Sequence, residues 1–315
     1  MRRRAILAGL LASPALAQSP ERAFRLIIAF PPGGSTDILG RLIVPRMGEV
    51  LGALVTPENR SGASGAVGAG FVAQAAPDGG TMLLDSGGQS VNPFLMRGLG
   101  FDYVRDLTPV TLLATLPLIL ITRGDYGVAD LPGLLARLRA APDQARYGSV
   151  GVGSRTHLAA ASLLRRAGLT GEHVPYRGGA DQMAGLLRGD VPFGFTSLAL
   201  AGPLIRDGKA RAIALSAPGR SAAFPALPTI SERGFAGFQM GDWLGLLAPA
   251  ATPAPVIARL AAAAKDAVEQ PALEPRLEAL GLSPAAEGPE VFARFLAAER
   301  AEMRELIAAE GIRLE

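Results

Sequence analysis

A continuous apolar run opens the first globular stretch of the chain. Residues 24–30 are interrupted only by Arg25, a pattern typical of a strand buried in a parallel sheet. Two prolines end the strand because neither can donate to a ladder, and the glycines at 33–34 leave backbone N–H groups uncovered. We expect Ser35 or Thr36 to cap the helix that follows. Strand, glycine turn and helix N-terminus together predict a pocket for a carboxylate or phosphate, although the same turn also occurs without a ligand.

Alternating apolar patterns of strand and helix length continue beyond this turn. Residues 38–51 form a helical stripe that contains Pro45, which we expect to kink or divide the helix. Strands are predicted at 53–57 and 81–85, with a helix of small residues between them that ends near residue 76. Ligands of open α/β sheets bind at the carboxyl ends of strands. The polar glycine turns after the first and third strands should therefore lie together.

Two long extended stretches occupy residues 110–123, interrupted by Pro117, and residues 238–248, and we interpret them as crossings between two lobes. Between them the pattern predicts helices at 131–140, 154–167 and 180–187, and strands at 145–150, 173–177, 191–197 and 210–216. Helices are also expected at 253–270 and 289–310. The predicted divisions are residues 18–115 with 243–315 for the first lobe, and 116–242 for the second. A ligand held between such lobes is enclosed by hinge closure.

A second glycine turn has the same sequence pattern as the first. Residues 147–158 again run from strand through glycines and a hydroxyl cap into a helix, and predict a second anion site that faces the first. Arg155 and His157 fall in the first helical turn, where both side chains could donate charge-assisted hydrogen bonds. Arg155 could equally be a solvated side chain. For His157 a structural role beneath the turn is favoured.

Composition narrows the classes of function. The 315 residues suffice for two domains, and 49% hydrophobic with 19% charged residues describes a packed globular protein. The formal charge of +3 includes Arg2, Arg3 and Arg4; without them 28 basic face 28 acidic residues. No basic run occurs elsewhere, which excludes a nucleic-acid role. The absence of cysteine from the sequence excludes disulfides and thiolate metal sites.

The first 17 residues have the layout of an export signal. Three arginines precede the apolar residues 5–12, and Ala15-Leu16-Ala17 is a small-x-small cleavage site, so we expect cleavage after Ala17 and a periplasmic protein. The signal fits either the Sec or the twin-arginine route. A frayed N-terminal helix is the alternative interpretation. No later stretch approaches the ~20 apolar residues of a membrane span.

Catalytic patterns are weak. No serine lies in a G-x-S-x-G turn, neither lysine completes a P-loop, and acidic residues are scattered without metal-ligand spacing. A relaxed G-x-G-x-x-A at 68–73 follows a loop instead of a strand, so dinucleotide binding is not expected. His157 and His173 are the two histidines of the chain. The enzyme hypothesis left open is an exported hydrolase with Ser154 as nucleophile and His157 as base.

Eight segments are informative in their order: FPPGGSTD at 30–37, ENRSGASG at 58–65, PDGGT at 77–81, DLTPV at 106–110, GVGSRTHL at 151–158, HVPYRG at 173–178, LPTISERG at 227–234 and DWLGLLAP at 242–249. Together they resemble the Bug, or TctC-like, solute-binding proteins of tripartite tricarboxylate transport systems, over essentially the whole mature chain. The resemblance implies an α/β, two-lobed periplasmic-binding-protein fold (Venus flytrap, type II) with two crossover strands. It also implies a non-enzymatic protein without cofactor or metal.

The resemblance further implies contacts to the ligand in both lobes. Those of the first lobe are Phe30, Pro32, Gly33, Gly34, Asp37, Ser86 and Gly87; those of the second are Gly153, Ser154, His157, Tyr176 and Thr196. One departure concerns charge: Asp181 stands where the family commonly has proline, and a buried negative charge there would repel a doubly anionic ligand.

The sequence therefore predicts an exported, monomeric protein that binds a small organic carboxylate (a di- or tricarboxylate, an acidic amino acid or an aromatic acid). It would deliver this solute to the membrane permease subunits of a tripartite tricarboxylate transporter. A ligand-sensing partner of a signalling system is an alternative that the residues leave open, beside the hydrolase.

Overall fold

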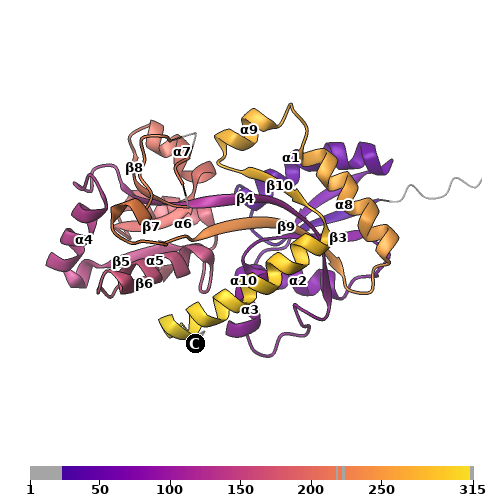
Figure 1. Cartoon of the computed structure of the whole chain (residues 1–315), viewed down its shortest axis with the longest axis horizontal. Helices are drawn as coiled ribbons and strands as arrows, with labels where there is room; N and C mark the ends of the chain where they lie inside the picture. The colour runs from indigo at the N-terminus through magenta and orange to yellow at the C-terminus, as the bar shows by residue number, and fades with distance from the viewer. Residues whose placement is uncertain (1–22, 218, 222–223, 313–315) are drawn as a thin grey trace, which may run out of the picture.

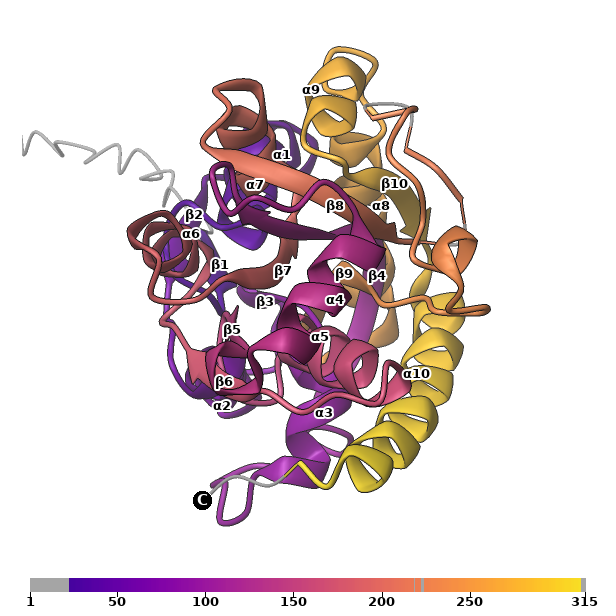
Figure 2. The same cartoon turned by 90° about the vertical axis from the view of Figure 1, so that its left-hand side faces the viewer.

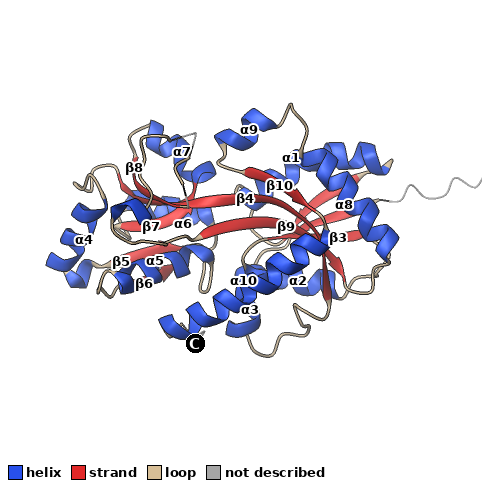
Figure 3. Ribbon diagram, viewed as in Figure 1, coloured by secondary structure: helices blue, strands red, loops and turns tan. Residues whose placement is uncertain are grey.

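The computed structural model describes residues 23–217, 219–221 and 224–312. The predicted export signal lies outside these residues. Within them the chain is elongated, and strands in the middle are flanked by helices on both faces (Figures 1 and 3). The strand order is β2-β1-β3-β9-β4-β7-β5-β6, with β8 and β10 paired to β4 off this path.

The strands at one end form what we call the first lobe. Its parallel strands are β1 (Phe24–Ile28), β2 (Val55–Asn59) and β3 (Thr81–Asp85). The antiparallel strand β9 (Gly241–Pro249) pairs with β3, and β10 (Ser283–Glu287) pairs with β4. All of β1 except Arg25 is buried, as a strand covered on both faces requires.

One strand belongs to both lobes. In β4 (Leu107–Arg123), residues 107–117 pair with β9, whereas residues 118–123 pair with β7 (Phe193–Ser197) and β8 (Ala210–Ser216). The strands β5 (Arg146–Ser149) and β6 (Glu172–Pro175) complete this second lobe, in which β5 is parallel to β6 and β7. The change of partners falls at Pro117, which cannot donate to a ladder. The two predicted crossings, by β4 and into β9, are thus present.

The helices occupy the connections between strands. Their bounds are α1 Ser35–Leu51, α2 Ala66–Ala73, α3 Gly88–Leu95, α4 Leu131–Ala140, α5 Arg155–Arg166, α6 Gly179–Arg188, α7 Leu198–Arg206, α8 Ala254–Val268, α9 Glu274–Ala279 and α10 Pro289–Glu310. No helix in the described part of the chain has the length and apolar character that crossing a membrane demands.

The last helix, α10, contacts the cores of both lobes. Its Phe292 and Leu296 pack with first-lobe residues, and its Met303 and Ile307 pack with second-lobe residues. In Figure 2, which faces the second lobe, α10 runs along one side of the molecule. Apart from this helix and α3, each lobe has its own buried clusters, so each is a unit of ordinary domain size.

Two expectations from the sequence are corrected, and four elements were not predicted. Helix α1 is continuous through Pro45 and is not divided, because Ile43 and Met47 on either side are fully buried. The second strand begins at Val55, since Gly52 ends α1 in a left-handed conformation with φ 64°. The helices α3, α7 and α9 and the strand β10 were not predicted.

Candidate functional site

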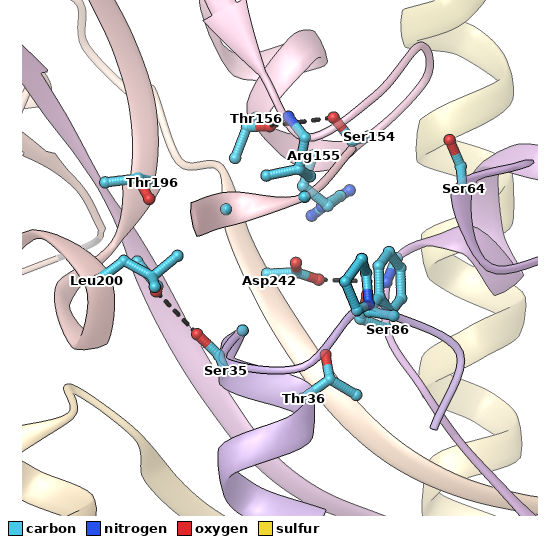
Figure 4. A pocket seen from close by; sticks show the side chains of 18 of the residues that line it. Ser35, Thr36, Ser64, Ser86, Ser154, Arg155, Thr156, Thr196, Leu200 and Asp242 are labelled. Atoms are coloured by element: carbon cyan, nitrogen blue, oxygen red, sulfur yellow. Dashed lines mark hydrogen bonds between the residues drawn. The ribbon is translucent and has the colours of Figure 1, made fainter. Parts of the chain in front are cut away.

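A cavity of about 200 Å³ lies between the two lobes. Its walls come from the ends of strands and the starts of helices, where the sequence predicted a site (Figure 4). Eight of the twelve predicted contacts line it: Phe30, Pro32, Gly34, Ser86, Gly87, Gly153, Ser154 and Thr196. Residues of both predicted glycine turns therefore face one space.

The start of α1 forms one wall of the cavity. Gly34 is the N-cap, and neither Ser35 nor Thr36 caps the helix, contrary to expectation. Within the described residues the backbone N–H groups of Ser35 and Thr36 have no hydrogen-bond partner. These groups carry the partial positive charge of a 17-residue helix. The wall is thus suited to a carboxylate.

Gly33 and Asp37 lie behind this wall and do not line the cavity. Gly33 has φ +83°, and its N–H donates to Oδ2 of Asp37 at 2.9 Å. The other oxygen of Asp37 accepts from Arg41 and from Asn59, each at 2.9 Å. Asp37 therefore fixes the glycine turn, and its negative charge is paired with a cation.

The opposite wall is the loop before α5. Ser154 caps this helix: its Oγ accepts from the N–H of His157 at 3.3 Å and donates to the carbonyl of Gly151 at 2.7 Å. Gly153 has φ +74°, and a Cβ there would lie 2.4 Å from Leu95 of the first lobe. Only glycine permits this close approach of the lobes.

His157 supports the loop from behind. Its Nδ1 accepts from the N–H of Gly153 at 3.0 Å, and its ring stacks on His173 with centroids 3.7 Å apart. Burial and the neighbouring His173 lower the pKa of His157 to about 3. Because its hydrogen bond to Ser154 Oγ comes from the backbone N–H, the ring is not placed as a base for Ser154. The favoured structural role of His157 agrees with this geometry.

Two predicted contacts in the second lobe differ in position. Thr196 is 1% exposed, and its Oγ1 has no hydrogen-bond partner among the described residues although Thr196 lines the cavity. Tyr176 does not line the cavity but a wider hollow outside it. Its ring packs so closely on Gly185 that a Cβ there would lie 2.3 Å from the hydroxyl. Thr196 therefore lies in the cavity wall with its hydroxyl enclosed and unpaired.

The lobes touch across the cavity. Ser35 Oγ donates to Ser197 Oγ at 2.8 Å, and Ser64 Oγ donates to the carbonyl of Val152 at 2.9 Å. Ser35, Ser64 and Ser197 all line the cavity and were not among the predicted contacts. Each serine hydroxyl finds its partner only when the lobes are together. The two lobes are therefore in the closed arrangement.

The floor of the cavity holds a group of charges. Asp242 is the second residue of β9 and lies between the start of α1 and the Ser154–Arg155 turn (Figure 4). Its Oδ1 accepts from the N–H groups of Gly87 at 3.2 Å and Trp243 at 2.9 Å. Burial raises the pKa of Asp242 to about 6, against the opposing effect of Arg155.

Arg155 occupies the same floor, and each nitrogen of its guanidinium group is bound within the protein. Nη2 pairs with Glu299 at 2.9 Å, Nε donates to the carbonyl of Gly241 at 2.8 Å, and Nη1 contacts the sulfur of Met303. Arg155 and Glu299 are 7% and 9% exposed in their side chains. The ion pair is buried and joins the second lobe to α10.

Among the described residues no group of three or more His, Cys, Asp or Glu side chains is arranged to hold a metal ion.

Behind the floor, burial raises the pKa of Asp85 to about 7, although Ser86 and Gln89 donate hydrogen bonds to it.

The chain is similar to known proteins over most of its length. Residues 39–312 match the model of the tripartite tricarboxylate transporter family receptor. A protein from the tcbD–tcbE intergenic region of Pseudomonas sp. (strain P51) is 35% identical over 289 residues, which cover 91% of this chain and 86% of the relative. Protein BugT of Bordetella pertussis is 30% identical over 308 residues, covering 97% of this chain and 94% of BugT.

Solved structures give the same result. The periplasmic binding protein BugD superposes with a TM-score of 0.89 at 30% identity, covering 94% of this chain and 100% of BugD. MatC of Rhodopseudomonas palustris, solved with malate, has a TM-score of 0.85 at 32% identity, covering 92% of this chain and 100% of MatC. A protein of R. palustris solved with adipate has a TM-score of 0.89 at 30% identity, covering 93% of this chain and 99% of that protein.

Proposed function

The chain belongs to the tripartite tricarboxylate transporter receptor (TctC) family, and on that premise we propose that it captures a small organic carboxylate between its lobes and delivers it to a membrane permease. It has the mixed α/β fold of periplasmic binding proteins. Members of this family are receptors that bind solutes without converting them. MatC and the adipate-bound relative hold dicarboxylates of different length, so the family alone does not fix the solute.

One observation supports the proposal above the others. The N-terminus of α1 opens into a cavity enclosed by both lobes, and the N–H groups of Ser35 and Thr36 have no partner within the described residues. A carboxylate at this position accepts hydrogen bonds from N–H groups that are already oriented. Ser154 and Thr196 line the same cavity from the other lobe. Binding therefore joins the two lobes.

We further propose the lobe divisions at residues 115/116 and 242/243, the remaining predicted contacts and export to the periplasm. The change of strand partners in β4 near Pro117 supports the first division, and Asp242 at the start of β9 supports the second. Export rests on residues 1–17, which have the layout of a Sec or twin-arginine signal, and on the periplasmic relatives. The partners would be the permease subunits, and the receptor would act as a monomer.

The test is a binding screen on the mature chain from residue 18. Thermal denaturation and calorimetry would be followed with dicarboxylates, tricarboxylates, acidic amino acids and aromatic acids at millimolar concentration. A ligand at ~100 times its Kd adds ~2.7 kcal/mol, which raises Tm by about 4 °C in a chain of this size. Failure of every carboxylate to raise Tm would contradict the proposal. So would turnover of an ester that His157→Ala abolishes.

A matched pair of variants locates the site. Ser35→Glu places a negative charge at the start of α1, where it stabilises the helix but repels a bound carboxylate. Gln144→Glu adds the same charge on an exposed turn in the second lobe. We expect Ser35→Glu to abolish binding while its unliganded Tm stays within a few degrees of the wild type. Gln144→Glu should bind normally.

A further inference from the structure

The cavity is electrically asymmetric, and this asymmetry indicates a class of ligand. On one side lies the start of α1, with the partial positive charge of its unpaired N–H groups. On the floor lies the carboxylate of Asp242. Both line the same cavity of about 200 Å³, a volume in which a small molecule contacts both at once.

Asp242 has no ion-pair partner among the described residues. Its two hydrogen bonds come from uncharged backbone N–H groups, those of Gly87 and Trp243, and both reach the same oxygen, Oδ1. No hydrogen bond within the described residues reaches Oδ2, and Asp242 borders both this cavity and a second hollow lined also by Trp243 and Glu299. The carboxylate therefore keeps one oxygen for a donor from outside the protein.

The nearby guanidinium does not neutralise Asp242. The three nitrogens of Arg155 are bound to Gly241, Glu299 and Met303, and Glu299 takes the ion pair. Glu299 also accepts from the indole N–H of Trp243 at 2.7 Å, which holds it in place. Together with Asp85, which interacts with Asp242, and Arg300, which interacts with Glu299, the floor and the groups behind it hold three carboxyl groups against two guanidinium groups.

Charges at the rim do not alter this balance. Arg177 and Asp181 both line the cavity and the hollow outside it, and both side chains are exposed. They carry opposite charges, and water screens them. The excess negative charge therefore lies at the buried floor, where the Coulomb interaction with a ligand is strongest.

We propose that the ligand carries an ammonium group beside its carboxylate, and that Asp242 is the residue that selects for it. This inference rests on the proposed function, because the carboxylate is placed at the start of α1. The ammonium donates to Oδ2 of Asp242 while the carboxylate accepts from the N–H groups of Ser35 and Thr36. A dianion of the same size would instead set a second negative charge against Asp242.

A series of three isosteric probes tests this on the wild-type protein. Succinate, malate and aspartate share a four-carbon dicarboxylate and differ by hydrogen, hydroxyl and ammonium at one carbon. Propionate, lactate and alanine form the same series with one carboxylate. If Asp242 contacts an ammonium, the amino member of at least one series binds about 10- to 100-fold more tightly than both others, because hydrogen bonds between charged groups are the strong ones. Malate cannot imitate this, since its hydroxyl has no charge.

The variant Asp242→Asn removes the charge and keeps an oxygen for Gly87 and Trp243. We expect it to reduce the preference for the amino member to less than threefold, and to leave binding of the deaminated member unchanged or improved. Asp143→Asn removes the same charge from an exposed turn and should keep the preference. If Asp242→Asn does not fold, the wild-type series still decides the question.

The outcomes separate this inference from the function on which it rests. If succinate or propionate binds as tightly as its amino analogue, or if the preference persists in Asp242→Asn, selection by Asp242 is wrong while carboxylate capture stands. If no carboxylate of any kind binds, both are wrong. A preference that Asp242→Asn removes and Asp143→Asn keeps supports the assignment.

Discussion

Ser35 donates a hydrogen bond to Ser197 at 2.8 Å, although 162 residues separate the two in sequence. Ser35 begins α1 in the first lobe, and Ser197 precedes α7 in the second. Their hydroxyls lie on the cavity wall, so the bond closes the space in which a ligand is held. This hydrogen bond therefore stabilises the closed arrangement of the lobes in addition to the contacts that a ligand makes.

The first prediction concerns this bond. Ser197→Ala should weaken ligand binding about 2- to 10-fold, because a hydrogen bond of ~0.5–1.5 kcal/mol is lost from the closed form. Calorimetry with a ligand from the screen measures the change. Ser283→Ala, an exposed serine far along the chain, serves as the control. Unchanged affinity in Ser197→Ala would mean that the bond persists without a ligand.

A second prediction uses the tight approach of the lobes at Gly87. A Cβ there would lie 2.5 Å from Cγ of Arg155, whose guanidinium is anchored and cannot move aside easily. Gly87→Ala should therefore hold the lobes apart and weaken binding at least 10-fold, with a smaller effect on the stability of the unliganded protein. Small-angle scattering would show a larger radius of gyration. Gly100→Ala, where a Cβ meets only ordinary contact, is the control.

Glu299 leads to a third prediction. Replacement by glutamine leaves the charge of Arg155 buried without a counter-ion, which costs ~3–5 kcal/mol in the free energy of unfolding. Denaturant unfolding measures it. Glu302→Gln, on an exposed position of the same helix, should change stability by less than ~0.5 kcal/mol. A small effect in Glu299→Gln would indicate that water reaches Arg155.

Asp85 gives a fourth prediction, on pH. Burial raises its pKa from 3.8 to about 7, so the folded state binds a proton that the unfolded state has released. Its contribution to stability is therefore greatest below pH 3.8 and is lost as the pH rises to about 7. Asp85→Asn should stabilise the protein at pH 8 by up to ~4 kcal/mol, and clearly less at pH 5. Equal effects at both pH values would contradict the assignment.

The stacked histidines His157 and His173 give a fifth prediction, in which stability depends on pH in the opposite direction to that of Asp85. Burial lowers the pKa of His157 from 6.5 to about 3 and that of His173 to about 4. Their contribution to stability is therefore full above pH 6.5 and is lost as the pH falls towards those values. In the folded protein, proton NMR should show both imidazole rings neutral down to about pH 5. A ring that titrates near pH 6.5 would contradict the burial.

The sequence alone predicted much of the fold, because long apolar runs and capped helices are local signals. The structure begins β3, β8 and α10 at the residues expected, whereas α3 and β10 were missed. Residues of α3 include glycine, asparagine and proline, which favour no helix, and its Val91 and Leu95 are buried against the second lobe. Similarly, β10 contains a proline and forms by pairing with β4. Both depend on contacts that no window of sequence contains.

For the candidate site, too, some features could be predicted from the sequence and others could not. The glycine turns could be predicted because glycine followed by a hydroxyl and a helix is a local pattern. The role of Asp242 could not, since it depends on Arg155 being bound to Glu299, more than 140 residues away. The spacing of Ser154 and His157 suggested a catalytic pair, yet their hydrogen bond uses the backbone of His157.

Helix α10 has a thermodynamic consequence. It is about 33 Å long, and its two ends are buried in different lobes. Separation of the lobes would therefore remove Met303 and Ile307 from the apolar side chains of the second lobe that surround them. When the lobes open to release the solute, this apolar surface, which lies away from the cavity, would become exposed to water. The heat capacity change of binding should accordingly be more negative than the small cavity itself accounts for.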